Sequence, residues 1–192
     1  MTKLVWAFLS ILAGVALGLG LTALSVDQPP NFGVVSVGPW QTRPRIGSAE
    51  ADPYSKALMA TRGEIPMGTA EGLLLSARAD SDGQPLTGAC SYRLAGTIPA
   101  ASYWTLAAYR PDGSTGESRG LRGVYTSTDV LQIEGEPLTV LLSPDPQPGN
   151  WLPLDPTQAF EVVLRLYETQ VSSNAQAIDK ASVPAIFRGN CR

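Results

Sequence analysis

Residues Leu4–Val26 read LVWAFLSILAGVALGLGLTALSV and contain no charged side chain. About 20 apolar residues at about 1.5 Å per residue cover the hydrocarbon core of a bilayer, which is about 30 Å thick. Inside lipid, a single segment satisfies its own backbone hydrogen bonds only as a helix. The stretch therefore predicts one transmembrane helix, and this prediction decides how the remainder of the chain is interpreted.

The charges beside this segment indicate its orientation. Lys3 precedes it, whereas the next charged residue is Asp27 and the next basic residues are Arg43 and Arg45. Basic residues beside a membrane helix stay on the cytoplasmic side. We therefore expect a single-pass protein of a bacterial inner membrane, with residues 4–26 in the bilayer, the N-terminus cytoplasmic and the C-terminal domain periplasmic.

A cleaved signal peptide is the alternative interpretation, because Ala23-Leu24-Ser25 resembles a small-x-small cleavage site. The apolar run is longer than the usual apolar region of about 7–15 residues, which favours a retained anchor. Ser10, Gly14 and Gly18 are spaced by four and form one smooth stripe on the helix. Such a stripe favours close packing against a partner membrane helix, although glycine is also frequent in membrane helices generally.

Composition limits the remaining function classes. The chain has 192 residues and a formal charge of −3, and the exported part has no cluster of lysine or arginine. Binding to nucleic acid is therefore not expected. The 19 glycines and 16 prolines are dispersed between apolar runs, which indicates many turns in one β-rich domain.

The chain contains no histidine. This excludes Ser-His-Asp and Cys-His catalysis and every metal site with an imidazole ligand. We predict no cofactor, no metal site and no catalytic residue. An enzyme built on this sequence would have to use carboxylates, lysine, tyrosine, serine or the backbone.

The chain has two cysteines, Cys90 and Cys191. In an oxidising periplasm two cysteines of one exported domain most simply form a disulfide. Two free thiols are the alternative, because the sequence does not fix the distance between them.

We expect three parts: a transmembrane anchor over residues 1–26, a linker with one short strand over 27–50, and a periplasmic β-rich domain over 51–192. Trp40, in the linker, is expected either at the membrane interface or on the domain. In the domain, Asp52 as N-cap and Pro53 at the first helical position predict one early helix that stops at Gly63.

Short apolar or alternating runs with turn residues between them follow this helix. Asp80-Ser81-Asp82-Gly83 has the composition of a turn, and the later ligands of a calcium loop are missing. The strands are expected at Gly72–Ala79, Cys90–Leu94, Tyr103–Arg110, Gly123–Ser127, Val130–Glu134, Leu138–Ser143, Phe160–Tyr167 and Val183–Phe187. This pattern predicts a mainly β, antiparallel domain of the sandwich or jelly-roll type with one early α-helix.

Four segments together resemble a known family. They are Asp52-Pro53-Tyr54, Tyr103-Trp104-Thr105-Leu106, Asn150-Trp151-Leu152-Pro153 and Val163-Leu164-Arg165-Leu166-Tyr167. Their order and spacing are similar to those of the bacterial "domain of unknown function 1214" family over nearly all of Ala51–Phe187. The resemblance implies a β-rich sandwich-like fold, no settled activity, and a short form with one N-terminal membrane helix.

Weak binding candidates lie in two of these segments. Asn150 and Trp151 either border a ligand cleft or hold a loop to the sheet, and we favour the structural role. Tyr103 and Trp104 are neighbours on a strand and point to opposite faces, so at least one is expected in the core.

Three functions remain open. The first is a membrane-tethered periplasmic binding or accessory domain, acting as a subunit of a larger membrane protein complex. The second is a small periplasmic hydrolase or ligand-binding domain with a cleft near Asn150 and Trp151. The third is an envelope structural protein without a specific ligand.

Overall fold

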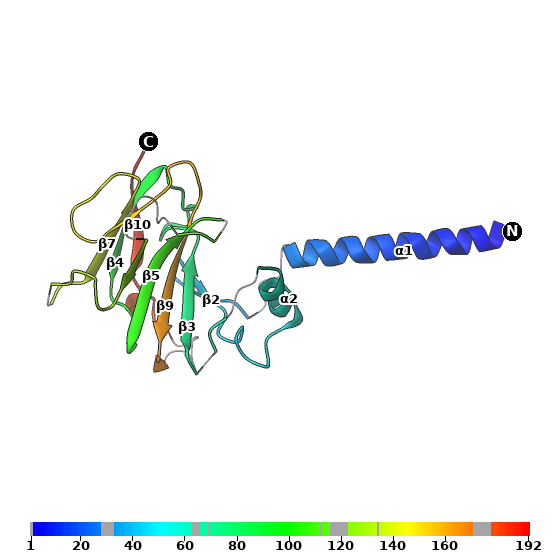
Figure 1. Cartoon of the computed structure of the whole chain (residues 1–192), viewed down its shortest axis with the longest axis horizontal. Helices are drawn as coiled ribbons and strands as arrows, with labels where there is room; N and C mark the ends of the chain where they lie inside the picture. The colour runs from blue at the N-terminus through cyan, green and yellow to red at the C-terminus, as the bar shows by residue number, and fades with distance from the viewer. Residues whose placement is uncertain are drawn as a thin grey trace. The chain divides into compact units, whose positions relative to one another are not determined.

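The computed structural model describes residues 2–27, 33–62, 66–68, 70–111, 113–115, 123–133, 135–170 and 178–192 (Figure 1). The chain divides into two compact units. The first comprises Met1–Phe32 and Arg45–Pro66, and the second comprises Gly33–Pro44 and Met67–Arg192.

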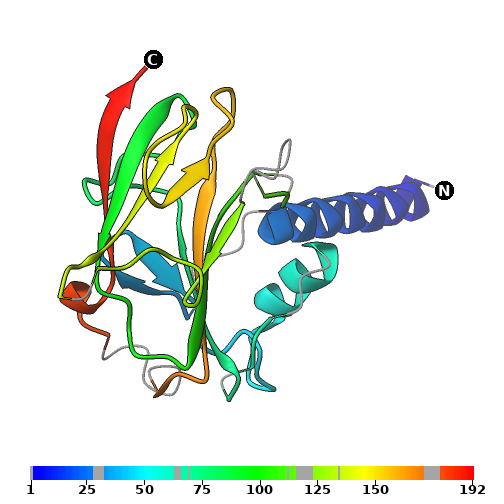
Figure 2. The same ribbon diagram turned by 60° about the vertical axis from the view of Figure 1, so that its left-hand side comes forward.

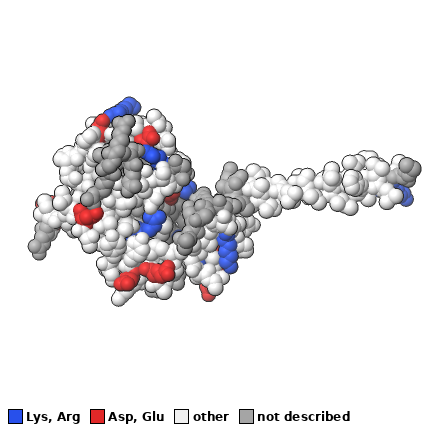
Figure 3. All heavy atoms as spheres, in the orientation of Figure 1, with Lys and Arg blue, Asp and Glu red and all other residues white. Residues whose placement is uncertain are grey.

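The first unit contains the predicted apolar helix. Helix α1 spans Thr2–Asp27, and its segment Thr2–Ser25 is long and apolar enough to cross a membrane, with a mean hydropathy of 2.3. None of this segment is buried in the protein. Figure 3 shows the visible face of α1 without charged side chains except for a basic one at its N-terminal end. A helix with this composition and no protein cover is a candidate for burial in lipid.

Helix α2 also lies in the first unit and spans Pro53–Arg62. Its predicted cap is present: the Ser55 amide donates to Asp52 Oδ1 at 3.0 Å, and the Ser55 hydroxyl donates to Oδ2 at 2.6 Å. These hydrogen bonds, first that of the Ser55 side chain, hold the pKa of Asp52 below its ordinary value. An N-cap of this kind satisfies amides that the first turn leaves without partners. Gly63, the expected stop, lies outside the described residues.

The second unit is a two-sheet sandwich (Figure 2). The larger sheet has the order β1-β2-β3-β9-β5-β6, with strands Val35–Val37, Trp40–Thr42, Gly72–Ala77, Glu161–Tyr167, Tyr103–Tyr109 and Val124–Thr126. The smaller sheet has the order β10-β4-β7-β8, with strands Ala185–Cys191, Cys90–Gly96, Leu138–Ser143 and Trp151–Pro153. A short 3₁₀ helix, Lys180–Ser182, precedes β10. The chain is therefore mainly β, as its sequence predicts.

The core lies between the two sheets. On β9, Val162, Leu164 and Leu166 share one face and are completely buried, and Val163 on the opposite face is buried as well. From the smaller sheet Leu94, Val140, Leu142 and Leu152 are completely buried too, and they belong to the same apolar cluster. Burial of each such side chain contributes about 1.5–3 kcal/mol, so this shared core holds the sheets together.

One predicted strand is wrong. Residues 130–133 of the expected strand Val130–Glu134 form no strand, and Leu131 and Ile133 are 70% and 67% exposed. Glu134 lies outside the described residues. The apolar side chains suggested a buried strand, but the segment is a loop that crosses the surface between β6 and β7.

Strand β8 was not predicted. Trp151–Pro153 pairs in parallel with β7, through the partners Leu141 and Trp151, whereas the other strand pairs are antiparallel in the part of the chain that the structure describes. Three residues ending in proline carry little strand signal, because proline cannot donate to a sheet. Proline is tolerated here because β8 is an edge strand.

Two strands, β1 and β2, lie within residues 27–50, where the sequence indicated one. Trp40, which starts β2, is completely buried, and its indole Nε1 donates to the Pro184 carbonyl at 2.7 Å. Burial of a whole indole with its N–H satisfied fixes this segment to the sandwich. The membrane-interface alternative for Trp40 is therefore excluded.

Candidate functional site

Asn150 is a buried hydrogen-bonding residue. Its Oδ1 accepts from the Leu131 amide at 2.8 Å, and its Nδ2 donates to the Leu131 and Thr139 carbonyls at 2.7 and 2.9 Å. The Asn150 side chain thus forms with the Leu131 backbone the hydrogen bonds that a neighbouring strand would otherwise form. Because both amide hydrogens are already used, Asn150 is poorly suited to contact a ligand.

Trp151 ties the same loop region to the sandwich. Its amide donates to the Tyr125 hydroxyl at 2.9 Å, and its indole Nε1 donates to the Ser143 carbonyl at 3.0 Å. The ring is half-buried on β8. These contacts match the structural role favoured for the Asn150-Trp151 segment.

Tyr103 and Trp104 lie on β5, in the other sheet. Trp104 is buried in the core cluster, so at least one of the pair is a core residue, as expected. Tyr103 is half-buried on the outer face, with its ring 5.8 Å from that of Tyr167. The structure does not gather these two residues with Asn150 and Trp151 into one cleft, and none of the four lines the two concave sites described below.

The C-terminal strand is fastened by several interactions. Cys90 and Cys191 form a disulfide that joins β4 to the end of β10. Arg188, on the same strand, donates through Nε to Asp80 Oδ2 at 2.8 Å and through a terminal nitrogen to the Pro85 carbonyl at 2.5 Å. Its guanidinium also lies 5.4 Å from the ring centroid of Tyr92. We call Asp80, Pro85, Tyr92 and Arg188, with the disulfide, the C-terminal clamp.

Asp80 is the buried carboxylate of this clamp, with its side chain 1% exposed. Burial alone would raise the pKa of Asp80, but the hydrogen bond from Arg188 and those from the Gln84 and Asp82 amides lower it below its ordinary value. Its oxygens also close the predicted turn, since Oδ1 accepts both amides. The turn interpretation of residues 80–83 is therefore correct, and the calcium-loop likeness has no geometric basis.

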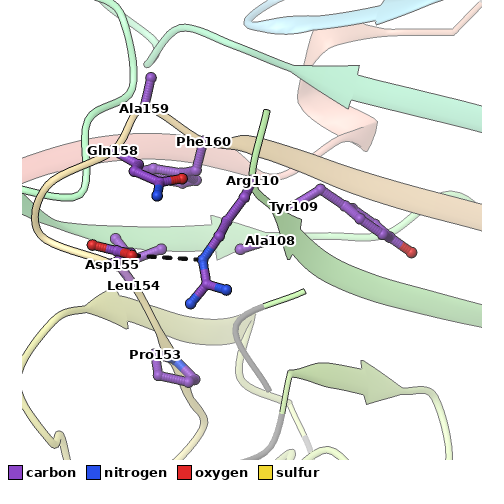
Figure 4. A pocket seen from close by; sticks show the side chains of 9 residues that line it. All are labelled: Ala108, Tyr109, Arg110, Pro153, Leu154, Asp155, Gln158, Ala159 and Phe160. Atoms are coloured by element: carbon purple, nitrogen blue, oxygen red, sulfur yellow. Dashed lines mark ion pairs between the residues drawn. The ribbon is translucent and has the colours of Figure 1, made fainter. Parts of the chain in front are cut away.

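A first concave site lies between Arg110 and Asp155 (Figure 4). Arg110 Nε lies 3.8 Å from Asp155 Oδ2, and hydrogen bonds from Thr157, its hydroxyl first, lower the pKa of Asp155. The cavity volume is about 10 Å³, which is at the threshold for holding a single water molecule. We interpret this site as a structural ion pair between Arg110, directly after β5, and Asp155 in the loop after β8.

A second concave site is much larger. It is a groove of about 420 Å³ on the smaller sheet, formed by β4, β7 and β10 with the loop that contains Gln147. Its lining residues are Ser91, Tyr92, Arg93, Leu141, Leu142, Ser143, Gln147, Phe187, Arg188, Gly189 and Asn190. We call it the sheet groove.

A row of side chains crosses the outer face of the smaller sheet at this groove. Strand register places Phe187 opposite Arg93, Arg93 opposite Leu141, and Leu141 opposite Trp151. Directly opposite residues share a face of a sheet. Phe187 is 44% exposed, and the Arg93 guanidinium lies 4.5 Å from its ring centroid. The row thus combines one stacked cation with three apolar side chains.

The sequence did not indicate Arg93, Leu141 or Phe187 as site residues. Both β4 and β10 were predicted as strands, but Arg93 and Phe187 are 94 positions apart, and alternation within a strand does not reveal its partner. The disulfide expected between Cys90 and Cys191 was the one available signal, because it brings the two strands together.

The smooth stripe on α1 is present as expected from helical spacing. The Ser10 hydroxyl donates to the Trp6 carbonyl at 2.9 Å, so its polar group is satisfied within the helix. A Cβ added at Gly14 or Gly18 would meet no atom within 4 Å. Thr22 continues the spacing, and its hydroxyl donates to the Gly18 carbonyl at 2.8 Å. Whether a partner helix lies there stays a prediction.

Comparison with protein families identifies the class of this sandwich. Residues 71–171, more than half of the chain, match the model of the family "Protein of unknown function (DUF1214)". The chain therefore belongs to the DUF1214 family, which its sequence motifs already indicated. No curated protein matches it.

One solved structure supports the fold. The chain is similar to the VPA0106 protein from Vibrio parahaemolyticus, with a TM-score of 0.57 and 19% identity, over 73% of this chain and 36% of that protein. A protein of uncharacterised function from Burkholderia cenocepacia aligns with a TM-score of 0.43 and 18% identity, over 64% of this chain and 30% of the other. The chain thus spans about a third of the length of the solved proteins that it matches.

Proposed function

We propose that this protein is a single-pass membrane protein whose DUF1214 domain serves as a binding or accessory subunit on the periplasmic side of a bacterial inner membrane. The observation that supports it most directly is α1, which has an apolar segment of 24 residues and no side chain of that segment buried in the protein. Such a helix in water would expose far more apolar surface than a soluble protein tolerates.

The proposed orientation follows from the flanking charges. Lys3, in the first turn of α1, is the basic residue that precedes the uncharged stretch Leu4–Val26, and Asp27 ends the helix. With the basic end cytoplasmic, the domain lies on the opposite side. A periplasmic domain also accounts for a disulfide, since exported domains meet an oxidising environment.

The proposed accessory role draws on two surfaces that offer contact sites. One is the small-residue stripe of α1, which suits another membrane helix. The other is the sheet groove, which presents a cation and apolar side chains together. A groove with this lining is suited to binding rather than to acid–base chemistry, since it contains no carboxylate among the described residues.

Membrane anchoring is tested on the protein in its native membrane. Alkaline carbonate should leave it in the membrane pellet, and its mass should correspond to the unprocessed N-terminus. A protease added outside spheroplasts should degrade the domain. A mature N-terminus near Val26, or release by carbonate, would overturn the proposed anchor.

The partner helix is tested by substitution. Gly14→Leu with Gly18→Leu should release any membrane protein that co-purifies in mild detergent, because leucine side chains separate the two helix backbones. Gly20→Leu is the matched control, since Gly20 is equally open but lies off the stripe. Equal co-purification of the double variant and the control would show that the glycines are incidental.

A further inference from the structure

We propose that the sheet groove binds an extended acidic segment of a protein partner, with a glutamate or aspartate side chain of that segment docked on Arg93. The inference builds on the proposed binding function and names the chemistry of the partner. Four observations lead to it: the state of Arg93, the pairing of the nearby acids, the shape of the groove and the row of apolar side chains.

Arg93 is held ready for an anion. Its guanidinium stacks 4.5 Å from the Phe187 ring centroid, and it has no ion pair or hydrogen bond with any residue that the structure describes. Stacking on an aromatic face leaves the edge of the guanidinium, with its N–H groups, directed outward. That edge matches a carboxylate, which accepts two parallel hydrogen bonds.

The other charges around the groove are already neutralised. Arg188, which also lines it, is paired with Asp80. Asp145, in the loop that supplies Gln147, is paired with Arg192. Among the described residues of this region, Arg93 thus carries a positive charge that no carboxylate pairs. The protein as a whole has a formal charge of −3. The groove therefore favours an anion against the overall charge of the protein.

The position of the groove on the face of one sheet favours a segment of protein chain. Small-molecule sites usually surround 70–90% of their ligand, whereas this groove lies along the surface of one sheet. A single arginine is also too little charge for a nucleic acid or a phosphate cluster. An extended chain fits better, because its residues i and i+2 share a face. An acidic residue can then meet Arg93 while apolar residues two positions away on either side meet Phe187 and Leu141.

The experiment uses the full-length protein in nanodiscs and a fluorescent decapeptide whose odd positions alternate leucine with glutamate and whose even positions are serine, so that one face presents both side chains. Binding is followed by anisotropy, with empty nanodiscs subtracted. The comparison peptides carry glutamine or lysine in place of glutamate. We expect the glutamate peptide to bind at least about fivefold more tightly than the glutamine peptide, with an affinity that falls as salt rises.

Arg93→Gln should weaken binding of the glutamate peptide by at least about fivefold, down to the affinity of the glutamine peptide. Arg78→Gln, which removes an exposed arginine directly after β3 of the larger sheet, is the matched control and should leave binding unchanged. Equal binding of the glutamate and glutamine peptides, or an Arg93→Gln variant that binds like the wild type, would overturn the proposal. These results are independent of the carbonate and protease tests, so failure of the anchor and failure of the groove are distinguished.

Discussion

Arg188 and Arg93 lie on neighbouring strands of the smaller sheet, and their surroundings differ in almost every respect. Arg188 reaches the nearly inaccessible carboxylate of Asp80 and the Pro85 carbonyl, beside the disulfide. Arg93 is exposed and contacts the ring of Phe187. The same side chain thus serves the fold on one strand and is available for binding on the next. Burial of the partner carboxylate, rather than the arginine itself, makes the difference.

The largest effect is expected on the clamp side, from the disulfide. Cys90 and Cys191 are 101 positions apart, and closing a loop of that length is valued at up to about 4–5 kcal/mol in the chain-entropy model. Reduction, or Cys90→Ser with Cys191→Ser, should lower the melting temperature clearly and expose the C-terminal strand to proteolysis. Two free thiols in protein isolated without reductant, or equal melting with and without reductant, would contradict this.

The next largest effect is a difference in stability between variants of Arg188 and Arg93. Arg188→Ala should cost about 3 kcal/mol of unfolding free energy, because it leaves the buried Asp80 carboxylate without its cation. Arg93→Ala is the matched control and should change stability by no more than about 0.5 kcal/mol. Urea unfolding of both variants measures the difference. Similar losses would remove the distinction between a clamp arginine and a binding arginine.

Asn150→Ala extends the comparison to the other edge of the sheet. It should cost about 2 kcal/mol, because the Leu131 and Thr139 backbone groups lose their partner in a partly buried site. Asn190→Ala, at an exposed position, should change stability by no more than about 0.5 kcal/mol. If the two alanine variants unfold alike, Asn150 does not hold the loop between β6 and β7.

The smallest effect is expected in how the free energy of unfolding changes with pH under acidic conditions. Because the pKa of Asp80 in the folded state lies below its ordinary value of 3.8, its ionised form stabilises the fold above that value. This contribution is lost as the pH falls through the folded pKa. Unfolding free energy should therefore decline more steeply below about pH 4 in the wild type than in Asp80→Asn. Parallel profiles would show that this carboxylate is not linked to folding.

The sequence was sufficient where burial imposes a simple pattern. The strand Phe160–Tyr167 was predicted from its alternation, because Val162, Leu164 and Leu166 all face one core. The prediction of a strand failed at Val130–Glu134, where Leu131 and Ile133 face solvent and the backbone of Leu131 is hydrogen-bonded by the side chain of Asn150. The pattern of apolar residues in one sequence indicates which positions are buried. It does not reveal a hydrogen bond between a backbone amide and a side chain far away in the sequence.

The candidate site illustrates the same limit. Asn150 and Trp151 attracted attention because an asparagine and a tryptophan in a loop are conspicuous, yet their polar atoms are bonded within the protein. Arg93 and Phe187 are ordinary residues of two strands. Only the register between β4 and β10 places one over the other, and register is set by packing of the whole sandwich.

The most direct measurement of the central contrast is a map of where the glutamate–leucine peptide contacts the sandwich. Isotope-labelled full-length protein in micelles, titrated with the peptide, should show chemical-shift changes at Ser91, Arg93, Leu141 and Phe187. The clamp carboxylate Asp80 should be unaffected. Changes confined to the outer face of the larger sheet, around Tyr109 and Arg165, or no saturable changes at all, would contradict the assignment of Arg93 as the binding arginine.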